Sequence, residues 1–502
     1  MSRPTHLERV KGTNDTLPPA AAQQRHVEES LLHFFASYGY RQIDVPLLEH
    51  TDLYLRKAGE DTLARLYSFT YQNRKLALRP ELTASVVRAA VEHLQTAPLP
   101  LRLCYSGPVF RYESPQRSRY RQFTQTGLEL LGAAGAAADA EAISLAVSGL
   151  DALGVHNYRL VIGHVGVLLA LLRHLDLDER LVVLLAGSME TLAERGAAPV
   201  MQRLRELYPD ATAQGADAAE DEESRSLAAL VQTLGEEKAR SAVLGLLGAM
   251  NVGLEGSRRQ EEIVDRLLAK FGRARQKPQI ETALALMQEL AQIKGTPEAA
   301  LSAAQALLAR HNISDAALIE LRQTLEALEA YQTPRERIGL DFALSRGLQY
   351  YTGLLFEIYH EGPIGERQLC GGGRYDDLAT TLGGSREMPA IGFAYGLERV
   401  LLALEAEGRL PGDHETTDVL VVPVNIEDHA YAVQVAGALR AKGRIVALDV
   451  KGRGVKACLQ HANRTGIPTV VIVGSEESAT QTVVVRNMAE RAERRITLAE
   501  LT

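Results

Sequence analysis

The chain has 502 residues, of which 46% are hydrophobic and 24% are charged, and its formal net charge at pH 7 is −8. This length exceeds what one compact core accommodates, so we expect two or three domains, and no stretch reaches the ~18 consecutive apolar residues that a membrane span needs. The negative charge argues against wholesale wrapping by nucleic acid but leaves room for a local nucleic-acid site.

The N-terminal residues and the cysteines indicate a compartment. The first fifteen residues, MSRPTHLERVKGTND, contain no apolar run, so we expect no secretory signal. Cys104, Cys370 and Cys458 lie far apart and form no CxxC pair. That spacing argues for a reducing compartment without disulfides and without a zinc site. We therefore expect a cytoplasmic protein with no metal held by its own side chains.

The first third of the chain predicts a helix, a strand and a hairpin. Residues 20–38 have helical spacing of apolar side chains, and 42–46 (QIDVP) predict a strand that ends in a proline. Residues 101–113 and 121–131 are strand-like and flank a polar, arginine-rich turn. Together they predict an antiparallel hairpin with a long loop.

The middle of the chain changes character. Residues 166–333 are rich in Ala, Leu, Glu, Arg and Gln with long helical periodicity, which predicts a mostly helical segment. Within it, 211–225 is small, acidic and without pattern, so we expect a loop there. Strand and glycine character returns from 338 to 396, and a helix at 397–407 and a linker at 408–417 follow.

The tail, 418–502, alternates between strands and helices. DVLVVPV, RIVALDV and TVVIVG predict strands, and 428–442 and 453–465 predict helices between them. This pattern is typical of a small three-layer α/β domain that folds independently.

Polar side chains share faces of the predicted hairpin. With period-2 alternation, Arg111 and Glu113 lie on one face of the first strand, and Gln125, Gly127 and Glu129 share a face of the second. Such groups are costly to bury without partners. They form either a solvated outer face with ion pairs, or a polar floor on which Arg111 binds a phosphate or carboxylate and Gln125 and Glu129 bind hydrogen-bond donors.

Two further segments carry the same kinds of residue. LALRPELTASVVRA places Glu81 and Thr83 beside a proline, between a strand end and a predicted helix. ALSRGLQYYTGLLFEIY places Arg346 four and five residues before Tyr350 and Tyr351. These residues are either half-buried strand aromatics and a surface ion pair, or parts of one site with the hairpin.

Two glycine-containing segments follow. The run Gly371–Gly373 in LCGGGRYDDL either permits close approach of the backbone to a ligand or simply makes a turn. IGFAYGLERVLL predicts a strand that enters a helix, with Arg399 in the first turn. That guanidinium either stacks on a purine ring or is exposed.

In this order, the segments resemble the motifs of class II aminoacyl-tRNA synthetases, and specifically of the histidyl-tRNA synthetase family. GYRQIDVPLLE resembles the first class motif, FRYESPQRSRYRQFTQTGLE the second and GFAYGLERV the third. RGLQYYTG and GGGRYDDL resemble two elements particular to the histidine enzymes, RGLDYYTG and GGGRYD. The resemblance covers about residues 1–165, 335–405 and, more loosely, 418–500.

The resemblance implies both an architecture and an activity. It implies an α+β fold with an antiparallel class II catalytic core (1–165 and 334–407), a mostly helical insertion (166–333) and a C-terminal α/β anticodon-binding-like domain (418–502). It also implies that a homodimer activates L-histidine with ATP and Mg²⁺ to histidyl-adenylate and pyrophosphate, and then transfers the histidine to tRNA(His). A class II first motif would place the segment around 39–50 at the dimer interface, since isologous pairing is the commonest oligomer symmetry.

Roles carry over by resemblance, position by position. The catalytic residues would be Arg346 and Arg111, of which Arg111 would bind the α-phosphate and the substrate carboxylate. The histidine site would contain Glu81, Thr83, Arg111, Gln125, Glu129, Arg346, Tyr350 and Tyr351. The ATP site would contain Arg111, Glu113 on the adenine side, Arg119 or Arg121 at the β- and γ-phosphates, and Arg399 on the adenine ring.

The chemistry is consistent with these roles. Activation joins a carboxylate to a triphosphate, so fixed guanidinium groups and Mg²⁺ must compensate negative charge. Neutral imidazole offers one donor and one acceptor, which Glu129 and a tyrosine hydroxyl can answer. A pocket built on such hydrogen bonds rejects apolar analogues strongly.

Three positions depart from the family pattern and leave an alternative open. Gln349 stands where the family has Asp, Thr124 replaces a His or an aromatic residue, and Leu82 replaces the glycine of many bacterial members. The first two departures resemble the regulatory subunit of ATP phosphoribosyltransferase, a relative that binds histidine, partners a catalytic subunit and loads no tRNA. A scaffolding protein with a relic site is a third, more remote reading.

The tail favours the synthetase, because the regulatory subunit ordinarily lacks an anticodon-binding domain and GIPTVVIVGSEE resembles the synthetase pattern. Within it, Arg453, Lys456 and Arg464 are either phosphate contacts around a second helix that Arg453 opens, or a solvated helix face.

Overall fold

The computed structural model describes most of the chain in two compact units. The residues described are 7–56, 64–113, 120–208, 238, 240–242, 244, 276–344, 350–362, 367–412 and 416–501. The larger unit comprises Met1–Asp15 and Val27–Leu410, and the smaller unit comprises Thr16–His26 and Pro411–Thr502. Among the helices in these ranges, none combines the length and the apolar character needed to cross a membrane.

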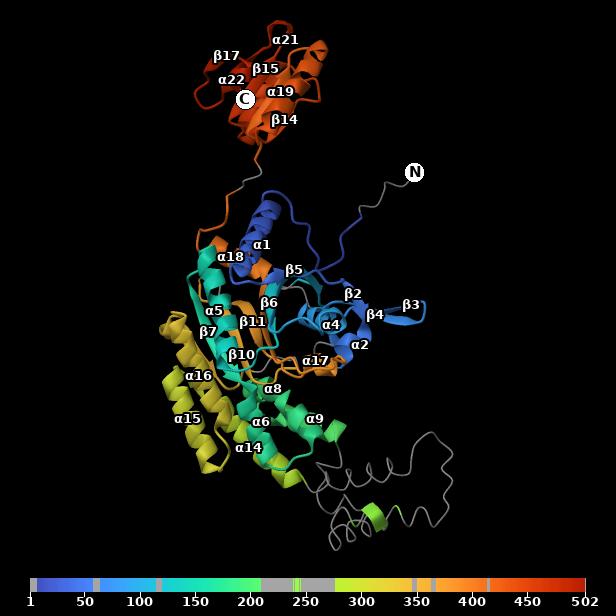
Figure 1. The fold of residues 1–502 in the computed structure, drawn as a ribbon, viewed down its shortest axis with the longest axis vertical. Helices are drawn as coiled ribbons and strands as arrows, with labels where there is room; N and C mark the ends of the chain where they lie inside the picture. Colours follow the sequence, from blue (N-terminus) through green and yellow to red (C-terminus); the bar gives the residue numbers. More distant parts are fainter. Residues whose placement is uncertain are drawn as a thin grey trace. The chain divides into compact units, whose positions relative to one another are not determined.

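A nine-stranded sheet forms the centre of the larger unit (Figure 1). Its order is β1 (Arg41–Gln42), β5 (Leu101–Phe110), β6 (Gln122–Leu131), β12 (Ala390–Gly396), β11 (Arg367–Arg374), β10 (Leu354–His360), β7 (Tyr158–His164), β9 (Ile338–Asp341) and β8 (Lys294–Gly295). The pairings from β5 to β7 are all antiparallel, and β1 and β9 join as parallel strands. This sheet confirms the expected α+β fold with an antiparallel core.

The predicted hairpin is β5 and β6, which pair from Leu101 with Leu131 to Phe110 with Gln122. The strand predicted at 42–46 is much shorter, because only β1 at Arg41–Gln42 is regular. One further ladder bond, from the Ile43 N–H to the Cys104 carbonyl, continues it. Pro46 has no N–H to donate, so pairing cannot continue there.

Period-2 alternation gives the sheet two apolar faces. Cys104 and Leu128 belong to the hydrophobic cluster on one face, whereas Tyr105 and Leu131 belong to a second cluster on the other. The end of α1 (Ala20–Ser37), α5 (Ala136–Leu153) and α18 (Leu397–Ala406) cover the first face, and α4 (Thr83–His93) and α17 (Leu378–Thr381) cover the second. We call the second face the α4 face.

The segment predicted as mostly helical is mostly helical where it is described. It contains α6 (Val165–His174), α7 (Glu179–Ala186), α8 (Met189–Arg195), α9 (Ala197–Leu207), α14 (Lys277–Ala291), α15 (Pro297–Arg310) and α16 (Ala316–Ala330). Buried residues of these helices belong to the same hydrophobic cluster as the first face of the sheet, and β8 joins the sheet beside β9. The loop predicted at 211–225 lies outside the described residues.

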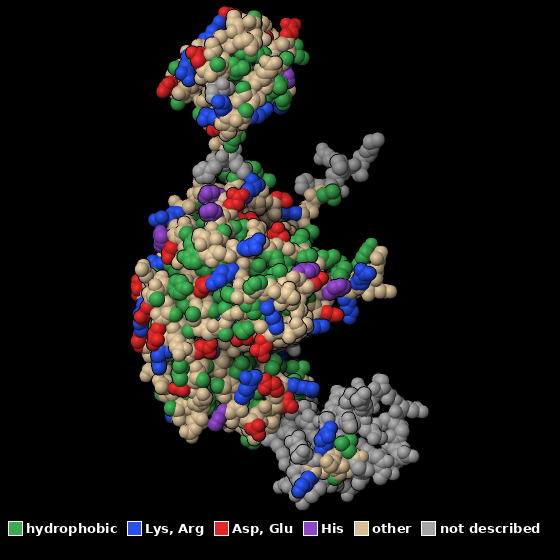
Figure 2. Space-filling view, in the orientation of Figure 1, with side chains coloured by type: hydrophobic (Ala, Val, Ile, Leu, Met, Phe, Trp, Pro, Cys, Tyr) green, Lys and Arg blue, Asp and Glu red, His purple; other side chains and the backbone are tan. Residues whose placement is uncertain are grey.

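A small sheet of three antiparallel strands stands beside the central one: β2 (Leu48–His50), β4 (Arg74–Leu78) and β3 (Ser68–Tyr71), with α2 (Thr51–Leu55) following β2. Five large hydrophobic residues on or beside these elements are exposed: Leu47, Leu48, Leu55, Phe69 and Tyr71. Figure 2 shows hydrophobic side chains in this part of the larger unit, at the right of the view.

The smaller unit is the expected three-layer α/β domain. Its strand order is β14 (Val446–Leu448), β13 (Val419–Pro423), β15 (Thr469–Val473), β16 (Thr482–Asn487) and β17 (Glu493–Thr497), of which the first three are parallel. Helix α19 (His429–Ala441) packs on one face and α20 (Val455–Thr465) on the other, each over its own apolar cluster. Helices α21 (Ser475–Thr480) and α22 (Leu498–Leu501) complete it.

Candidate functional site

The α4 face carries polar side chains along β6, whose first four residues are at least partly exposed and whose last six are buried. Gln125, Gly127 and Glu129 of this strand lie on that face, as their alternation predicts. Their register partners on β12 are Gly396, Ala394 and Gly392. Gly392 leaves the space that the Glu129 carboxyl group fills, since a Cβ atom there would collide with Glu129 Oε2.

A pocket of about 90 Å³ opens on this face. Its lining residues are Arg111, Glu113, Tyr120, Phe123, Gln125, Gln368, Leu369, Cys370, Gly371, Ala394, Gly396, Glu398 and Arg399. Four residues that the sequence proposed for ATP or histidine therefore share one cavity, although they come from the hairpin and from a helix almost 300 residues further along the chain: Arg111, Glu113, Gln125 and Arg399.

The two arginines of the pocket are held by backbone carbonyls. Arg111 donates from Nε to the carbonyl of Pro80 over 2.8 Å, and its guanidinium lies 5.3 Å from the centre of the Phe123 ring. Arg399 donates from Nη1 to the carbonyl of Gln368 over 2.9 Å. Both charges are thus oriented by backbone carbonyls, that of Gln368 in β11 and that of Pro80 in the bend before α4.

Gln125 carries a further sign of a ligand site. Its Oε1 atom is buried, and no described residue donates a hydrogen bond to it. A buried acceptor without a donor costs free energy in the folded protein. A ligand N–H or O–H at this point of the pocket would remove that cost.

Arg119 and Arg121 of the hairpin loop are the two candidates for the β- and γ-phosphates. Arg121 stacks on the Tyr112 ring, 4.0 Å from its centre, and donates from Nε to the Glu113 carbonyl over 3.1 Å, so it does not line the pocket. Arg119 lies outside the described residues. The assignment of either to the β- and γ-phosphates stays a prediction.

Glu129 is fully buried at the centre of a hydroxyl cluster. Its Oε1 accepts hydrogen bonds from Thr83 over 2.7 Å and from Tyr105 over 2.8 Å, and its Oε2 accepts one from Tyr375. Burial raises the pKa of Glu129 to about 8, although these hydrogen bonds oppose the rise. The carboxyl group is therefore mainly protonated at neutral pH.

Glu81 caps the start of α4 beside this cluster. Its two carboxylate oxygens accept the Ala84 N–H over 3.1 and 3.2 Å. Burial raises the pKa of Glu81, while the Ala84 N–H and the charge of Arg111 pull it down. Glu81 thus lies between a helix start and the charge of Arg111, where it can receive an ammonium group.

The tyrosine pair packs over β11. The Tyr350 ring lies 4.9 Å from that of Tyr351 and 5.7 Å from that of Tyr375. A Cβ atom on Gly373 would come within 2.8 Å of Tyr351 Cε1, so only glycine lets this ring approach the strand. The proposed Arg346 and the unusual Gln349 lie outside the described residues.

The sequence patterns do not single out Tyr105, Tyr375 or Gln368. Tyr105 could have been found, because alternation back from Arg111 along β5 reaches it on the same face. Tyr375 follows the glycine run directly after Arg374, but nothing local shows that its hydroxyl meets Glu129. Gln368 is tied to Arg399 only by tertiary structure.

In the smaller unit, α20 begins at Val455, so the prediction that Arg453 opens this helix is wrong. The N–H and Nε of Arg453 instead donate to the buried Asp449 carboxylate over 2.9 and 2.7 Å, which holds the residue before the helix. Lys456 and Arg464 lie in α20 and are exposed.

The chain is similar to histidine–tRNA ligases along nearly its whole length. The family model described as "Histidyl-tRNA synthetase" matches residues 12–257 and 262–400, and the "Anticodon binding domain" model matches 418–502. The histidine–tRNA ligase of Methanocaldococcus jannaschii is 32% identical over 99% of this chain and 99% of its own length. That of Pyrococcus furiosus is 31% identical over 96% of this chain and 94% of its own length.

Solved structures show the same fold. The histidyl-tRNA synthetase from Nostoc sp. PCC 7120 superposes with a TM-score of 0.63 at 20% identity, over 99% of this chain and 98% of that one. An ATP phosphoribosyltransferase regulatory subunit/histidyl-tRNA synthetase from Bacillus halodurans C also superposes with a TM-score of 0.63. Its identity is 24%, over 94% of this chain and 100% of that one. At these identities the likeness concerns the fold alone.

Proposed function

We propose that this chain, which belongs to the histidyl-tRNA synthetase family, activates L-histidine with ATP and transfers the histidine to tRNA. The observation that carries the proposal is the juxtaposition on β6 of two different sites. Gln125 lines a pocket with two guanidinium groups, and Glu129, two alternating positions along the strand, lies among hydroxyl groups. The first suits a nucleotide and a carboxylate, and the second suits an imidazole ring.

On the nucleotide side, the guanidinium groups compensate charge. Arg111 would hold the α-phosphate and the histidine carboxylate together, and Arg399 would stack on the adenine ring. Glu113, which lines the same pocket, would accept from the adenine side. The predicted catalytic role of Arg346 rests on the same argument, that a guanidinium group compensates the negative charge of the reacting phosphate and carboxylate.

On the amino acid side, Glu129 would accept the imidazole N–H, and a hydroxyl of the tyrosine pair would donate to the other ring nitrogen. The α-amino group would lie near Glu81 and Thr83 at the start of α4, and could donate to Gln125 Oε1, which accepts from no residue that the structure describes.

The chemistry proceeds by two substitutions. A carboxylate oxygen of histidine attacks the α-phosphorus of ATP, and the bond to the β-phosphate oxygen breaks, so pyrophosphate leaves with its electron pair. A ribose hydroxyl at the tRNA 3′ end then attacks the acyl carbon, loses its proton, and AMP leaves. Negative charge grows on the phosphate oxygens in the first step, which is where the fixed charge of Arg111 lowers the barrier.

Mg²⁺ fits this donor set only together with ATP. Mg²⁺ prefers oxygen ligands and is usually held by one or two carboxylates plus substrate phosphates. Within the described ranges, no group of three His, Cys, Asp or Glu side chains could hold a metal ion. The pocket wall offers two carboxylates, Glu113 and Glu398. Mg²⁺ bound to the triphosphate would neutralise part of its charge.

The smaller unit would bind the anticodon region of tRNA(His). The match to an anticodon-binding family over 418–502 supports this assignment. Lys456 and Arg464 are the phosphate contacts we propose, because both are exposed on α20. Arg453 is a weaker candidate, since Asp449 already neutralises it.

A cytoplasmic homodimer is the form we propose for the active protein. Beside the first class motif, the β2–β4–β3 sheet exposes hydrophobic side chains that a monomer would leave in water (Figure 2). Leu48, Phe69 and Tyr71 are among these exposed residues. Burial of this surface against a second copy would remove it from water.

The test is histidine-dependent exchange of pyrophosphate into ATP, followed by charging of tRNA. We expect both with wild-type protein and Mg²⁺, and neither with other amino acids. Histidine binding without exchange would refute the synthetase and favour the alternative, a regulatory subunit that partners the catalytic subunit of ATP phosphoribosyltransferase.

A further inference from the structure

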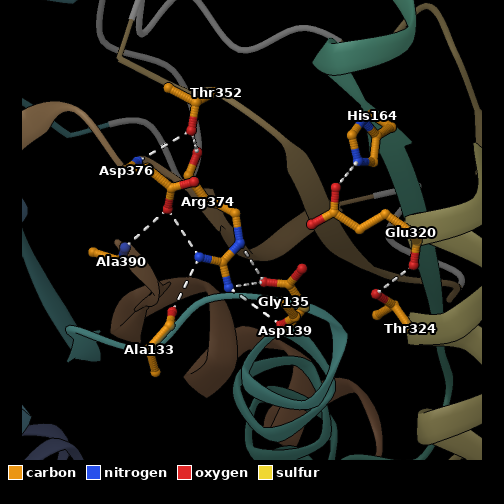
Figure 3. A network of polar contacts seen from close by, with 10 residues as sticks. All are labelled: Ala133, Gly135, Asp139, His164, Glu320, Thr324, Thr352, Arg374, Asp376 and Ala390. Carbon is orange, nitrogen blue, oxygen red and sulfur yellow. Dashed lines mark hydrogen bonds and ion pairs between the residues drawn. The ribbon is translucent and has the colours of Figure 1, made fainter. Parts of the chain in front are cut away.

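Arg374, the last residue of β11, is buried on the side of the strand opposite the substrate. Its neighbours Gly373 and Tyr375 face the α4 side, where they contact Tyr351 and Glu129. The Arg374 side chain instead points towards α5 (Figure 3). It therefore cannot touch the substrates of the proposed reaction, and any effect on them must pass through the backbone.

A set of acceptors surrounds this guanidinium. Nε and Nη2 of Arg374 donate to Asp139 Oδ1 over 2.8 and 2.6 Å, and Nη1 donates to the Ala133 carbonyl over 3.1 Å and to Asp376 Oδ1 over 2.9 Å (Figure 3). The residue ties the turn between β6 and α5 to the end of β11.

The network continues to the segment that carries the tyrosine pair. Asp376 Oδ1 also accepts the Ala390 N–H over 3.0 Å, and the Asp376 N–H donates to Thr352 Oγ1 over 3.1 Å. The Thr352 N–H donates to the Arg374 carbonyl over 2.8 Å. Thr352 directly follows Tyr350 and Tyr351, so the hydrogen bonds between its backbone N–H and Arg374 and between its hydroxyl and Asp376 fix the end of the tyrosine segment.

Stability alone is a poor explanation for such a network. Arg374 is 2% exposed and Asp139 is 0% exposed, so both charges have lost their hydration. Burial raises the pKa of Asp139 to about 6 in spite of Arg374, so the carboxylate is destabilised by desolvation, whereas the two aspartates raise the pKa of Arg374. Buried ion pairs of this kind often stabilise a fold no better than apolar residues would.

His164 does not replace Arg374 as the cation. Burial, together with the charge of Arg374, lowers the pKa of His164 to about 4, so its ring is neutral at neutral pH. Its Nε2 lies 3.8 Å from Glu320 Oε2 on α16, at the edge of the network (Figure 3). Arg374 is therefore the charge that fixes the two aspartates.

We propose that Arg374, Asp376 and Thr352 are positioning residues for the histidine pocket, which hold Tyr350 and Tyr351 in place over β11. The inference rests on the proposed function, because it assumes that the tyrosine pair meets the histidine side chain. Arg374 fixes the strand below the rings, and Thr352 fixes the chain immediately after them. Removal of the Thr352 hydrogen bonds should weaken histidine recognition. It should leave the ATP pocket, on the other side of Gln125, unchanged.

The experiment compares three variants of the full-length protein. Thr352→Val keeps the shape of the side chain but removes the hydroxyl, and Thr352→Ser retains the hydroxyl. The control variant, Thr380→Val, removes a hydroxyl in nearby α17 that donates to the Asp377 carbonyl. We measure the KM values for histidine and for ATP in pyrophosphate exchange, the histidine Kd by calorimetry, and the thermal midpoint. Thr352→Val should raise the KM and Kd for histidine about five-fold with an unchanged KM for ATP. Thr352→Ser and Thr380→Val should match wild type.

The outcomes separate the possible failures. A Thr352→Val protein that melts earlier but binds both substrates normally would overturn the inference, because the hydroxyl would then be merely structural. Equal increases in both KM values would overturn it too. If Thr352→Val does not fold, Asp376→Asn, which keeps an acceptor and loses the charge, must give the same selective loss. Wild-type protein that binds no histidine would refute the proposed function and this inference with it.

Discussion

Glu129→Gln tests the buried carboxyl at the centre of the proposed histidine pocket. Burial raises the pKa of Glu129 from 4.5 to about 8 in the folded protein. Between these values the unfolded chain has lost the proton and the folded chain keeps it, so the free energy of unfolding falls as pH rises. The two pKa values differ by about 3.5, and at about 1.4 kcal/mol for each the loss is on the order of 5 kcal/mol.

The direction follows from the protons bound. Because the folded state binds more protons than the unfolded state in this window, the contribution is fully present below about pH 4.5 and is lost by about pH 8. Glutamine has nearly the same size and no charge, so Glu129→Gln lacks this pH dependence. The free energy of unfolding of the variant minus that of wild type should therefore rise steadily across this window.

The assay is urea denaturation of the larger unit at a series of pH values, followed by circular dichroism. Glu194→Gln, an exposed position in α8, is the matched control and should follow wild type at every pH. Glu129→Gln should also bind histidine more weakly, since the amide keeps only one acceptor oxygen where the carboxyl group has two. A constant difference between Glu129→Gln and wild type at all pH values would refute the assignment of a protonated, buried Glu129.

Four further outcomes follow from the site and the fold. Gly392→Ala should abolish histidine binding in calorimetry, because the added Cβ atom would collide with Glu129 Oε2. Normal histidine affinity of this variant would contradict the proposed location of the histidine pocket. Arg399→Ala should raise the KM for ATP about ten-fold, as expected for loss of a desolvated stacking contact, and should leave the KM for histidine unchanged. A change in the KM for histidine alone would contradict the proposed role of Arg399 in ATP binding. Truncation to residues 1–412 should preserve pyrophosphate exchange and weaken tRNA charging, increasingly so at higher salt, whereas unchanged charging would remove the case for an anticodon-binding tail. Light scattering at micromolar concentration should give a dimer through the segment around 39–50, and a monomer would rule that interface out.

Local periodicity is enough to predict which residues share a strand face. Alternation along residues 121–131 predicts that Gln125 and Glu129 lie on the same side of their strand, and in the folded protein both lie on the α4 face. The order of the five motifs likewise indicates the family, and the strand–helix alternation of the tail indicates a separate α/β domain. These features depend on periodicity and on spacing along the chain, which a sequence displays directly.

Contacts between distant segments, in contrast, come only from the packed molecule. Tyr375 donates to Glu129 across 246 positions of the chain, and Arg374 reaches Asp139 across 235. No local pattern predicts such pairs, because they depend on which strands become neighbours in the central sheet. Burial is also a tertiary property: the same Glu129 would keep an ordinary pKa on a solvated strand, and only its enclosure among hydroxyl groups and apolar side chains raises that pKa to about 8.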